Sequence, residues 1–325
     1  MRYFPSVRAN CWAVVCCVMA VLGLSSLAKA EGPKEYVKTV EVSGTVISIG
    51  SDTLANLMNF WSEGFKKLHP NVTFQIEAKG SATAPPALTE GKSVLGPMSR
   101  AMKPEEVDAF EAKHGFKPTK YDVALDCVAV WVHKDNPVKG FTLAQLDSIF
   151  SKTRKFGYED VSTWGQAGVS DAAWADQPIS LYGRNSESGT YAYFKEHAMK
   201  KGDYKDSVKQ QPGSAGVVQA VGKDRQGIGY SGIGYRTSDV RAVPLAKDET
   251  VKVVEPTFEN SLNGTYPLGR TLFIYVAKKP NEPLPPVVKE FLRFVLSKQG
   301  QEIVVKDGFG QLPDEKLEKN VKALD

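Results

Sequence analysis

A chain of 325 residues with a formal net charge of +4 is long enough for two ordinary domains. Residues 1–30 contain Arg2, Arg8 and Lys29 and no acidic residue, so the remainder carries 38 basic against 37 acidic residues. This near-neutral balance argues against nucleic-acid binding, which requires a clear basic excess. Only Cys127 of the four cysteines lies outside residues 1–30, which excludes an internal disulfide and a thiolate metal cluster there. Its apolar neighbours predict a buried, inert thiol.

The N-terminal segment has the pattern of a secretory signal. Two arginines precede a mostly apolar run over 11–27, and Ala28-Lys29-Ala30 supplies small residues for cleavage before Glu31. A membrane anchor is the alternative, but the run is short for a membrane span and a cleavage signal follows it. We therefore predict a signal peptide over 1–30 and a secreted protein.

Strand and helix patterns alternate along the rest of the chain, which favours an α/β fold. Apolar strands are predicted at 46–49, 72–78, 94–98, 123–132, 180–184, 227–235 and 270–276. Helices are predicted at 54–68, 85–91, 104–114, 142–150, 285–296 and 301–306, and from Thr190 and Gly213 onward.

Two long apolar strands, 123–132 and 270–276, are candidates for segments that pass between two lobes. Lobe I is then discontinuous, with residues 31–128 and 268–325, and lobe II comprises residues 129–267. Ligands in such arrangements bind between the lobes, at the carboxyl ends of strands.

Four turns that carry hydroxyl groups each follow a predicted strand, at 51–53, 81–83, 99–100 and 186–190. A single turn of this kind is more often a helix cap than a ligand site. Four such turns, two of them with an arginine, favour a shared site because strands of one sheet deliver their turns to a common edge.

The turn from Arg184 to Thr190 is the most informative of the four. It precedes a predicted helix whose first backbone N–H groups lack partners and attract anions. Arg184 and the hydroxyls of Ser186, Ser188 and Thr190 add further donors. The pattern predicts a site that binds a tetrahedral oxyanion and performs no chemistry on it.

Asp126 is a lone acid within the apolar strand 123–132, so it must be paired if it is buried. An ion pair with Arg100 or Arg184 is one interpretation. The other is that Asp126 accepts a hydrogen bond from a ligand that carries a proton, and the two interpretations are compatible.

From Gly44 to the C-terminus, the chain resembles the periplasmic phosphate-binding proteins of bacterial phosphate ABC transporters. The resemblance lies in Gly50-Ser-Asp-Thr-Leu54, Gly80-Ser81, Ser99-Arg100, Arg184-Asn-Ser-Glu-Ser-Gly-Thr190 and Gly227-Ile-Gly-Tyr230. It implies a two-lobed periplasmic binding protein fold of type II, with a mixed sheet flanked by helices in each lobe and two hinge-crossing strands. It further implies capture of inorganic phosphate in the periplasm and delivery to an inner-membrane permease, without a metal or other cofactor. We expect a monomer.

The resemblance also implies which residues hold the phosphate oxygens: Thr53, the Leu54 amide, Ser81, Arg184, Ser188, Gly189 and Thr190. One position departs from a well-known branch of the family, in which a carboxylate stands where this chain has Arg100. Arg100 would add a donor, so the acceptor for the ligand proton must come from elsewhere. Asp126 is our first candidate for this acceptor and Asp52 the second. The position of Ser186 is often acidic in the family, which predicts weaker bracing of Arg184 here.

Two other functions compete with phosphate capture. A binding protein for sulfate or molybdate would need only donors, so a working acceptor separates the two cases. A secreted phosphatase or serine hydrolase would need a base, but none of the four histidines falls in a motif with these serines. The chain also has no Gly-x-Ser-x-Gly elbow and no Asp/His metal motif, so we predict that it is not an enzyme. A secondary role as an adhesin or scaffold is compatible with the sequence.

Overall fold

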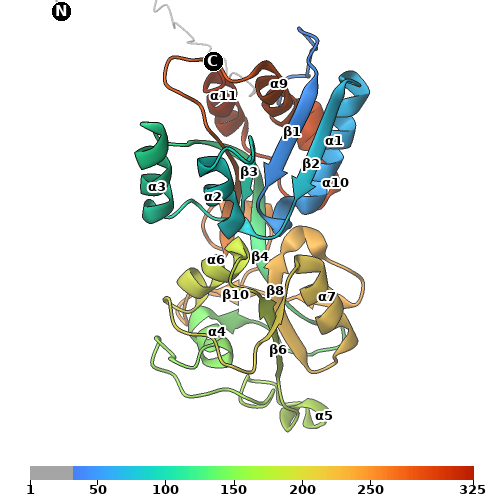
Figure 1. Cartoon of the computed structure of the whole chain (residues 1–325). Coiled ribbons are helices and arrows are strands. Elements are labelled where there is room, and N and C mark those ends of the chain that lie inside the picture. Colours follow the sequence, from blue (N-terminus) through green and yellow to red (C-terminus); the bar gives the residue numbers. More distant parts are fainter. Residues whose placement is uncertain (1–31) are drawn as a thin grey trace, which may run out of the picture. The chain divides into compact units, whose positions relative to one another are not determined.

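The computed structural model describes residues 32–325, and at its centre one long strand pairs with different strands along its first and second parts. β4 (Thr119–His133) pairs antiparallel with β11 (Gly269–Val276) along its first part and with β8 (Gly227–Gly232) along its second part. These are the two predicted crossing strands and the glycine-rich strand (Figure 1). The predicted signal peptide, residues 1–30, lies outside the described residues.

The remaining strands extend this arrangement on both sides. The sheet has the order β3-β11-β4-β8-β6-β7, and β9 also pairs with β4. Its other members are β3 (Gly96–Met98), β6 (Ser180–Arg184), β7 (Lys209–Gln211) and β9 (Val240–Ala242). Two parallel pairs complete the strands: β1 (Gly44–Ile49) with β2 (Val72–Glu77), and β5 (Phe141–Thr142) with β10 (Leu245–Ala246).

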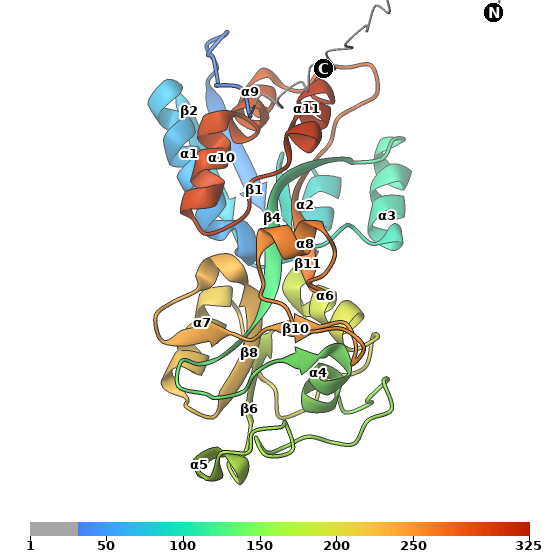
Figure 2. The ribbon, with the colours of Figure 1, turned by 180° about the vertical axis from the view of Figure 1, so that it is seen from behind.

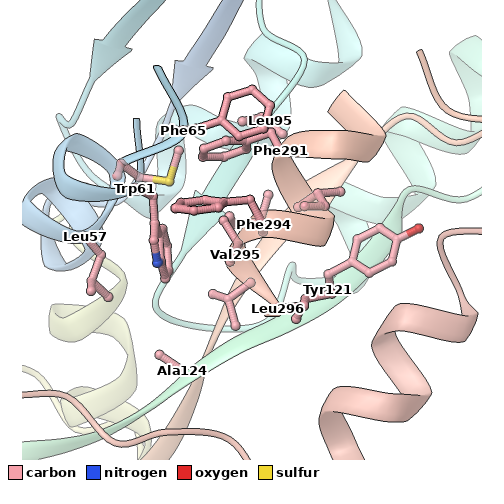
Figure 3. Close-up of a cluster of buried hydrophobic side chains, with 14 of the residues drawn as sticks. Leu57, Trp61, Phe65, Leu95, Tyr121, Ala124, Phe291, Phe294, Val295 and Leu296 are labelled. Atoms are coloured by element: carbon pink, nitrogen blue, oxygen red, sulfur yellow. The ribbon is translucent and has the colours of Figure 1, made fainter. Parts of the chain in front are cut away.

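The first hydrophobic core is formed by residues from 36–125 and from 272–324, and we call the part around it lobe I. Helices α1 (Ala55–Leu68), α9 (Pro286–Val295) and α10 (Lys298–Lys306) pack beside β1 and β2, as both ribbon views show (Figures 1 and 2). In Figure 3, Trp61 and Phe65 of α1 lie against Phe291 and Phe294 of α9. The buried Trp61 indole donates its N–H to the Gly300 carbonyl at 2.8 Å, which anchors α10.

Three further helices belong to lobe I. They are α2 (Ala84–Thr89), α3 (Pro104–His114) and α11 (Asp314–Lys322). α3 ends at His114, as the sequence predicts, and Gly115 with a φ of 77° forms its left-handed C-cap. α11 was not predicted, because its sequence is strongly polar and presents few apolar residues, of which Leu317 is buried.

The second core is formed by residues from 127–268, and we call the part around it lobe II. Its helices are α4 (Leu143–Phe150), α5 (Ala172–Ala175), α6 (Gly189–Ala198), α7 (Ser214–Lys223) and α8 (Phe258–Leu262). The fold is therefore mixed α/β with helices flanking the sheets, as the sequence predicts. The lobe boundaries after residues 128 and 267 stay predictions.

Most predicted elements appear within a few residues of their expected bounds. The helix expected at 301–306 begins earlier, at Lys298, because Ser297 caps it by accepting the Gly300 N–H. Cys127 is buried as predicted, and this burial raises the pKa of its thiol to about 12. Within residues 32–325, no helix combines the length and the apolar character that a membrane crossing requires.

Candidate functional site

Three of the four predicted turns meet in lobe I through their serine hydroxyls. The turns follow β1, β2 and β3, and each places one buried serine in the cluster: Ser51, Ser81 and Ser99. Ser51 Oγ donates to Ser99 Oγ at 3.0 Å, and the Oγ atoms of Ser81 and Ser99 are 3.2 Å apart. The Ser99 amide also donates to Ser81 Oγ at 3.0 Å. We call these three residues the serine cluster.

The fourth turn, from lobe II, closes against this cluster. Thr190 Oγ1 lies 3.0 Å from Thr53 Oγ1, and the Ala82 amide donates to the Glu187 carbonyl at 3.0 Å. A Cβ on Gly189 would overlap Ser81 Oγ and lie 2.6 Å from Ser99 Oγ, so only glycine fits there. The predicted ligands Thr53, Ser81, Gly189 and Thr190 are therefore brought together.

The N-terminus of α6 lies beside this cluster, with Gly189 against Ser81 and Ser99 and Thr190 against Thr53. Ser188 is the N-cap of this helix, and its Oγ accepts from the amides of Thr190 at 3.1 Å and Tyr191 at 3.3 Å. The Ser188 O–H remains a donor while its lone pairs cap the helix. The Leu54 amide donates to the Ser51 carbonyl at a long 3.3 Å, within the short 3-10 helix Asp52–Leu54.

Arg184 at the end of β6 is a buried cation with an unused donor. Its side chain is 1 % exposed, and it donates to Ser214 Oγ at 2.6 Å and to the Pro212 carbonyl at 3.1 Å. Asp52 Oδ2 lies 3.2 Å from Arg184 Nη2. Burial lowers the pKa of the guanidinium, and the Asp52 charge opposes that shift. Among the described residues, Arg184 Nε has no hydrogen-bond partner, so it is free to donate to an anion.

Asp126 is fully buried and paired, but the expectation that Arg100 or Arg184 would be its partner is wrong. The partner is Arg270, which stands opposite Asp126 in the antiparallel register of β4 and β11. Arg270 Nε and Nη2 donate to Asp126 Oδ2 at 2.8 and 2.6 Å, and the Ile233 amide donates to Oδ1 at 3.1 Å. Burial raises the pKa of Asp126, while the Arg270 charge and these hydrogen bonds favour its ionised form.

Arg270 is the main site residue that sequence reasoning missed. Its Nη1 donates to the Ser99 carbonyl at 2.9 Å and its Nη2 to Thr190 Oγ1 at 3.0 Å, so one side chain joins both lobes. The sequence did contain a signal for this pair. One arginine and one aspartate each stand on an apolar strand, and two such residues pair readily when the strands are adjacent. Ser51 and Ser99 belong to predicted turns but were not among the predicted ligands.

Arg100 is not brought into the serine cluster. Its Nη1 and Nη2 donate to the Glu106 carboxylate of α3 at 2.7 and 2.6 Å, and Nη1 also reaches the Ala101 carbonyl at 2.9 Å. Charge-assisted, bidentate pairs of this kind are stronger than neutral hydrogen bonds. It directs the guanidinium toward α3.

A cleft of about 920 Å³ opens beside the cluster, with Ser99, Ser186 and Arg270 in its lining. The lining also contains four other cationic side chains: Arg100, Lys103, Lys195 and Lys201. Each of these four has a carboxylate partner within 4 Å, so their net field is weak. Attraction of an anion must therefore come mainly from the donors in the cluster.

A metal site is not part of this arrangement. In the range 32–325, no three side chains of His, Cys, Asp or Glu are grouped so that they could hold a metal ion.

Comparisons with known proteins agree on one family. A family model described as a PBP superfamily domain matches residues 39–299. The chain is 56% identical over 310 residues to the "Phosphate-binding protein PstS" of Pseudomonas aeruginosa, which covers 94% of this chain and 96% of the relative. It is 32% identical over 264 residues to the protein of the same name from Staphylococcus epidermidis, covering 80% and 77%.

Solved structures give the same result. A putative phosphate ABC transporter substrate-binding protein with bound phosphate from Clostridium perfringens superposes with a TM-score of 0.70 at 29% identity, covering 83% of this chain and 100% of that one. An ABC-type phosphate transport receptor from Vibrio cholerae has a TM-score of 0.64 at 23% identity, covering 82% and 100%, which supports the fold.

Proposed function

Because the chain belongs to the PBP superfamily and, within it, to the family of the PstS phosphate-binding proteins, we propose that it captures inorganic phosphate for a phosphate ABC transporter. We further propose that it does so in the periplasm, as a monomer, and delivers the ion to an inner-membrane permease. The predicted signal peptide and the family support the location. The family is one of solute-binding proteins and not of enzymes.

The observation that carries this proposal is the buried set of donors between the lobes. The serine cluster, Thr53 and Thr190 meet at the N-terminus of α6. Arg184, which pairs with Asp52 next to Thr53 in the chain, keeps an N–H that has no partner among the described residues. Two ion pairs, Arg184 with Asp52 and Arg270 with Asp126, balance the fixed charges. An oxyanion there is held by many hydrogen bonds and a helix N-terminus, not by a surplus of cations.

Choosing phosphate over sulfate needs an acceptor for the proton that phosphate carries. We propose Asp126, because its Oδ1 has one amide partner at 3.1 Å while Oδ2 holds the Arg270 guanidinium. A carboxylate oxygen can accept a second hydrogen bond, and the ion pair favours the charged, accepting form. Sulfate has no proton to donate, so it would face the carboxylate unpaired.

Calorimetric titration of the mature protein with phosphate, arsenate and sulfate tests the function. We expect tight binding of phosphate, competition by arsenate because of its similar shape and protonation, and no binding of sulfate. Equal affinities for sulfate and phosphate would contradict the proposal. Turnover of a phosphomonoester that Ser188→Ala abolishes would instead indicate an enzyme.

Replacing Asp126 by Asn tests the acceptor. We expect the ratio of the phosphate to the sulfate association constant to fall by at least about tenfold, because the amide can donate to sulfate. Asp160→Asn, which also removes an ion-paired carboxylate but lies in lobe II away from the cluster, is the matched control. An unchanged ratio in Asp126→Asn would remove Asp126 from this role.

A further inference from the structure

Asp52 of lobe I forms an ion pair with Arg184 of lobe II. It lies in lobe I, in the turn that follows β1, whereas Arg184 ends β6 in lobe II. Asp52 Oδ2 is 3.2 Å from Arg184 Nη2, and Asp52 is the one carboxylate within ion-pair distance of Arg184 among the described residues. The charge that balances the buried guanidinium therefore comes from the opposite lobe.

The same carboxylate oxygen caps a helix of lobe II. It accepts the Ser214 amide, at the first residue of α7, at 2.8 Å. Gly213, the N-cap of α7, offers no side-chain acceptor, so Asp52 supplies the acceptor in its place. A Cβ on Gly213 would lie 3.0 Å from Asp52 Oδ1, which shows how closely the two lobes approach here.

The backbone of Asp52 is held as well. The Tyr235 hydroxyl of lobe II donates to the Asp52 carbonyl at 2.7 Å. Asp52 thus contacts three elements of lobe II: the end of β6, the start of α7 and the turn after β8. None of these contacts can persist if the lobes separate.

Within lobe II, Arg184 has only neutral partners, the Ser214 hydroxyl and the Pro212 carbonyl. A guanidinium held by neutral acceptors is less firmly oriented than one that also has a carboxylate partner. We propose that Asp52 is a positioning residue: it fixes the Arg184 guanidinium for the ligand only when the lobes close, and so makes ligand retention depend on closure. This inference rests on the proposed capture of phosphate.

The ion pair with Asp52 explains how the Arg184 guanidinium has a carboxylate partner although Ser186 is not acidic. A carboxylate partner in lobe II would orient Arg184 in the open and closed forms alike. Because its carboxylate partner, Asp52, lies in lobe I, Arg184 is more mobile until the lobes close. An ion can then enter an adaptable site and is held tightly once the cleft has closed.

Substitution of Asp52 by Asn separates charge from capping, because the Asn oxygen can still accept the Ser214 amide. Stopped-flow and calorimetric titration with inorganic phosphate should show weaker binding by about tenfold or more, as for loss of a charge-assisted contact. The loss should lie mainly in a faster dissociation rate. Asp52→Ala, which also removes the cap, should weaken binding further, and Asp52→Glu should restore part of the affinity.

Three controls make the result specific. Asp160→Asn should bind phosphate as the wild type does. In an Arg184→Gln background, Asp52→Asn should cost at most about threefold, since a positioning residue acts through Arg184. The preference for phosphate over sulfate should not change in Asp52→Asn.

Two outcomes would overturn the inference. Unchanged dissociation in both Asp52→Asn and Asp52→Ala would show that the contact does not retain the ligand. A collapse of phosphate-over-sulfate preference in Asp52→Asn would make Asp52 the acceptor of the ligand proton instead. Failure of the wild type to bind phosphate would contradict the proposed function itself, so the two failures are distinguishable.

Discussion

Buried charge at single positions is the feature that shapes this site. Asp126 and Arg270 are almost completely buried, and each leaves an uncompensated charge if the other is removed. A buried ion pair contributes little net stability when intact, yet breaking it from one side costs a great deal. Arg270 therefore supports the fold and the site together, because it also donates to Ser99 and Thr190.

Replacing Arg270 by Gln should destabilise the protein by about 3 to 5 kcal/mol, because Asp126 is left buried without a cation. Urea unfolding monitored by tryptophan fluorescence measures this change. The double variant with Asp126→Asn should recover a large part of the loss, since an amide pair carries no buried charge. A single variant as stable as the wild type would contradict this role of the pair.

At the scale of elements, the site is assembled from the ends of strands and the starts of helices. β1, β2, β3 and β6 deliver the turns, and Ser188 caps α6 where the turn meets lobe I.

Helix ends also set local electrostatics elsewhere in the chain. At the C-terminus of α10, Asp307 places a carboxylate where the helix dipole is already negative.

Asp307 should make stability depend on pH. Burial raises the pKa of its carboxyl to about 6, and one carboxylate oxygen is buried without a hydrogen-bond partner among the described residues. Between about pH 4 and pH 6 the folded protein keeps this proton while the unfolded chain loses it, so stability falls as pH rises. Above the folded-state pKa, the ionised Asp307 lowers the free energy of unfolding by its full amount.

Asp307→Asn should consequently stabilise the protein at pH 7 by about 1 to 2 kcal/mol, a value reduced for the partial exposure of the group. Urea unfolding at pH 4, 5, 6 and 7 should show a flatter stability profile for the variant. Asp314→Asn is a suitable control, because that acid lies at the N-terminus of α11, where the helix dipole favours it. Equal pH profiles for Asp307→Asn and the wild type would contradict the prediction.

At the scale of the whole described chain, contacts between the lobes coincide with the anion site. Thr53 meets Thr190, Asp52 meets Arg184, and the Tyr235 hydroxyl meets the Asp52 carbonyl. β4 runs from lobe I into lobe II beside these contacts, pairing first with β11 and then with β8 (Figures 1 and 2). A bound anion would add hydrogen bonds across the same boundary and so favour the closed, folded form.

Phosphate should therefore stabilise the whole protein against heat. At a free concentration 100 times the Kd, a ligand that binds only the folded state adds about 2.7 kcal/mol to the free energy of unfolding. Differential scanning calorimetry should show a rise in Tm with phosphate and little change with sulfate at the same ionic strength. An equal rise with both ions would indicate a non-specific salt effect.

The sequence by itself determined the longer helices and strands except α11, the α/β class and the turns that carry the hydroxyl groups. These are local properties: apolar periodicity marks β4 and α1, and Thr142, Ser188 and Gly115 mark helix ends. The resemblance to phosphate-binding proteins rested on the same local motifs, and the comparisons confirm it.

Only the tertiary structure decided which charges meet. Arg100 turned to Glu106 in α3, Arg270 took Asp126 through the register of two strands, and Asp52 reached Arg184 from the other lobe. A long, flexible arginine has many reachable carboxylates. Arg100 found one six residues away, whereas the partners of Arg270 and Arg184 depend on strand pairing and lobe contacts that no local pattern encodes. Neighbours in space but not in sequence thus set the electrostatics of the site that the turns had located.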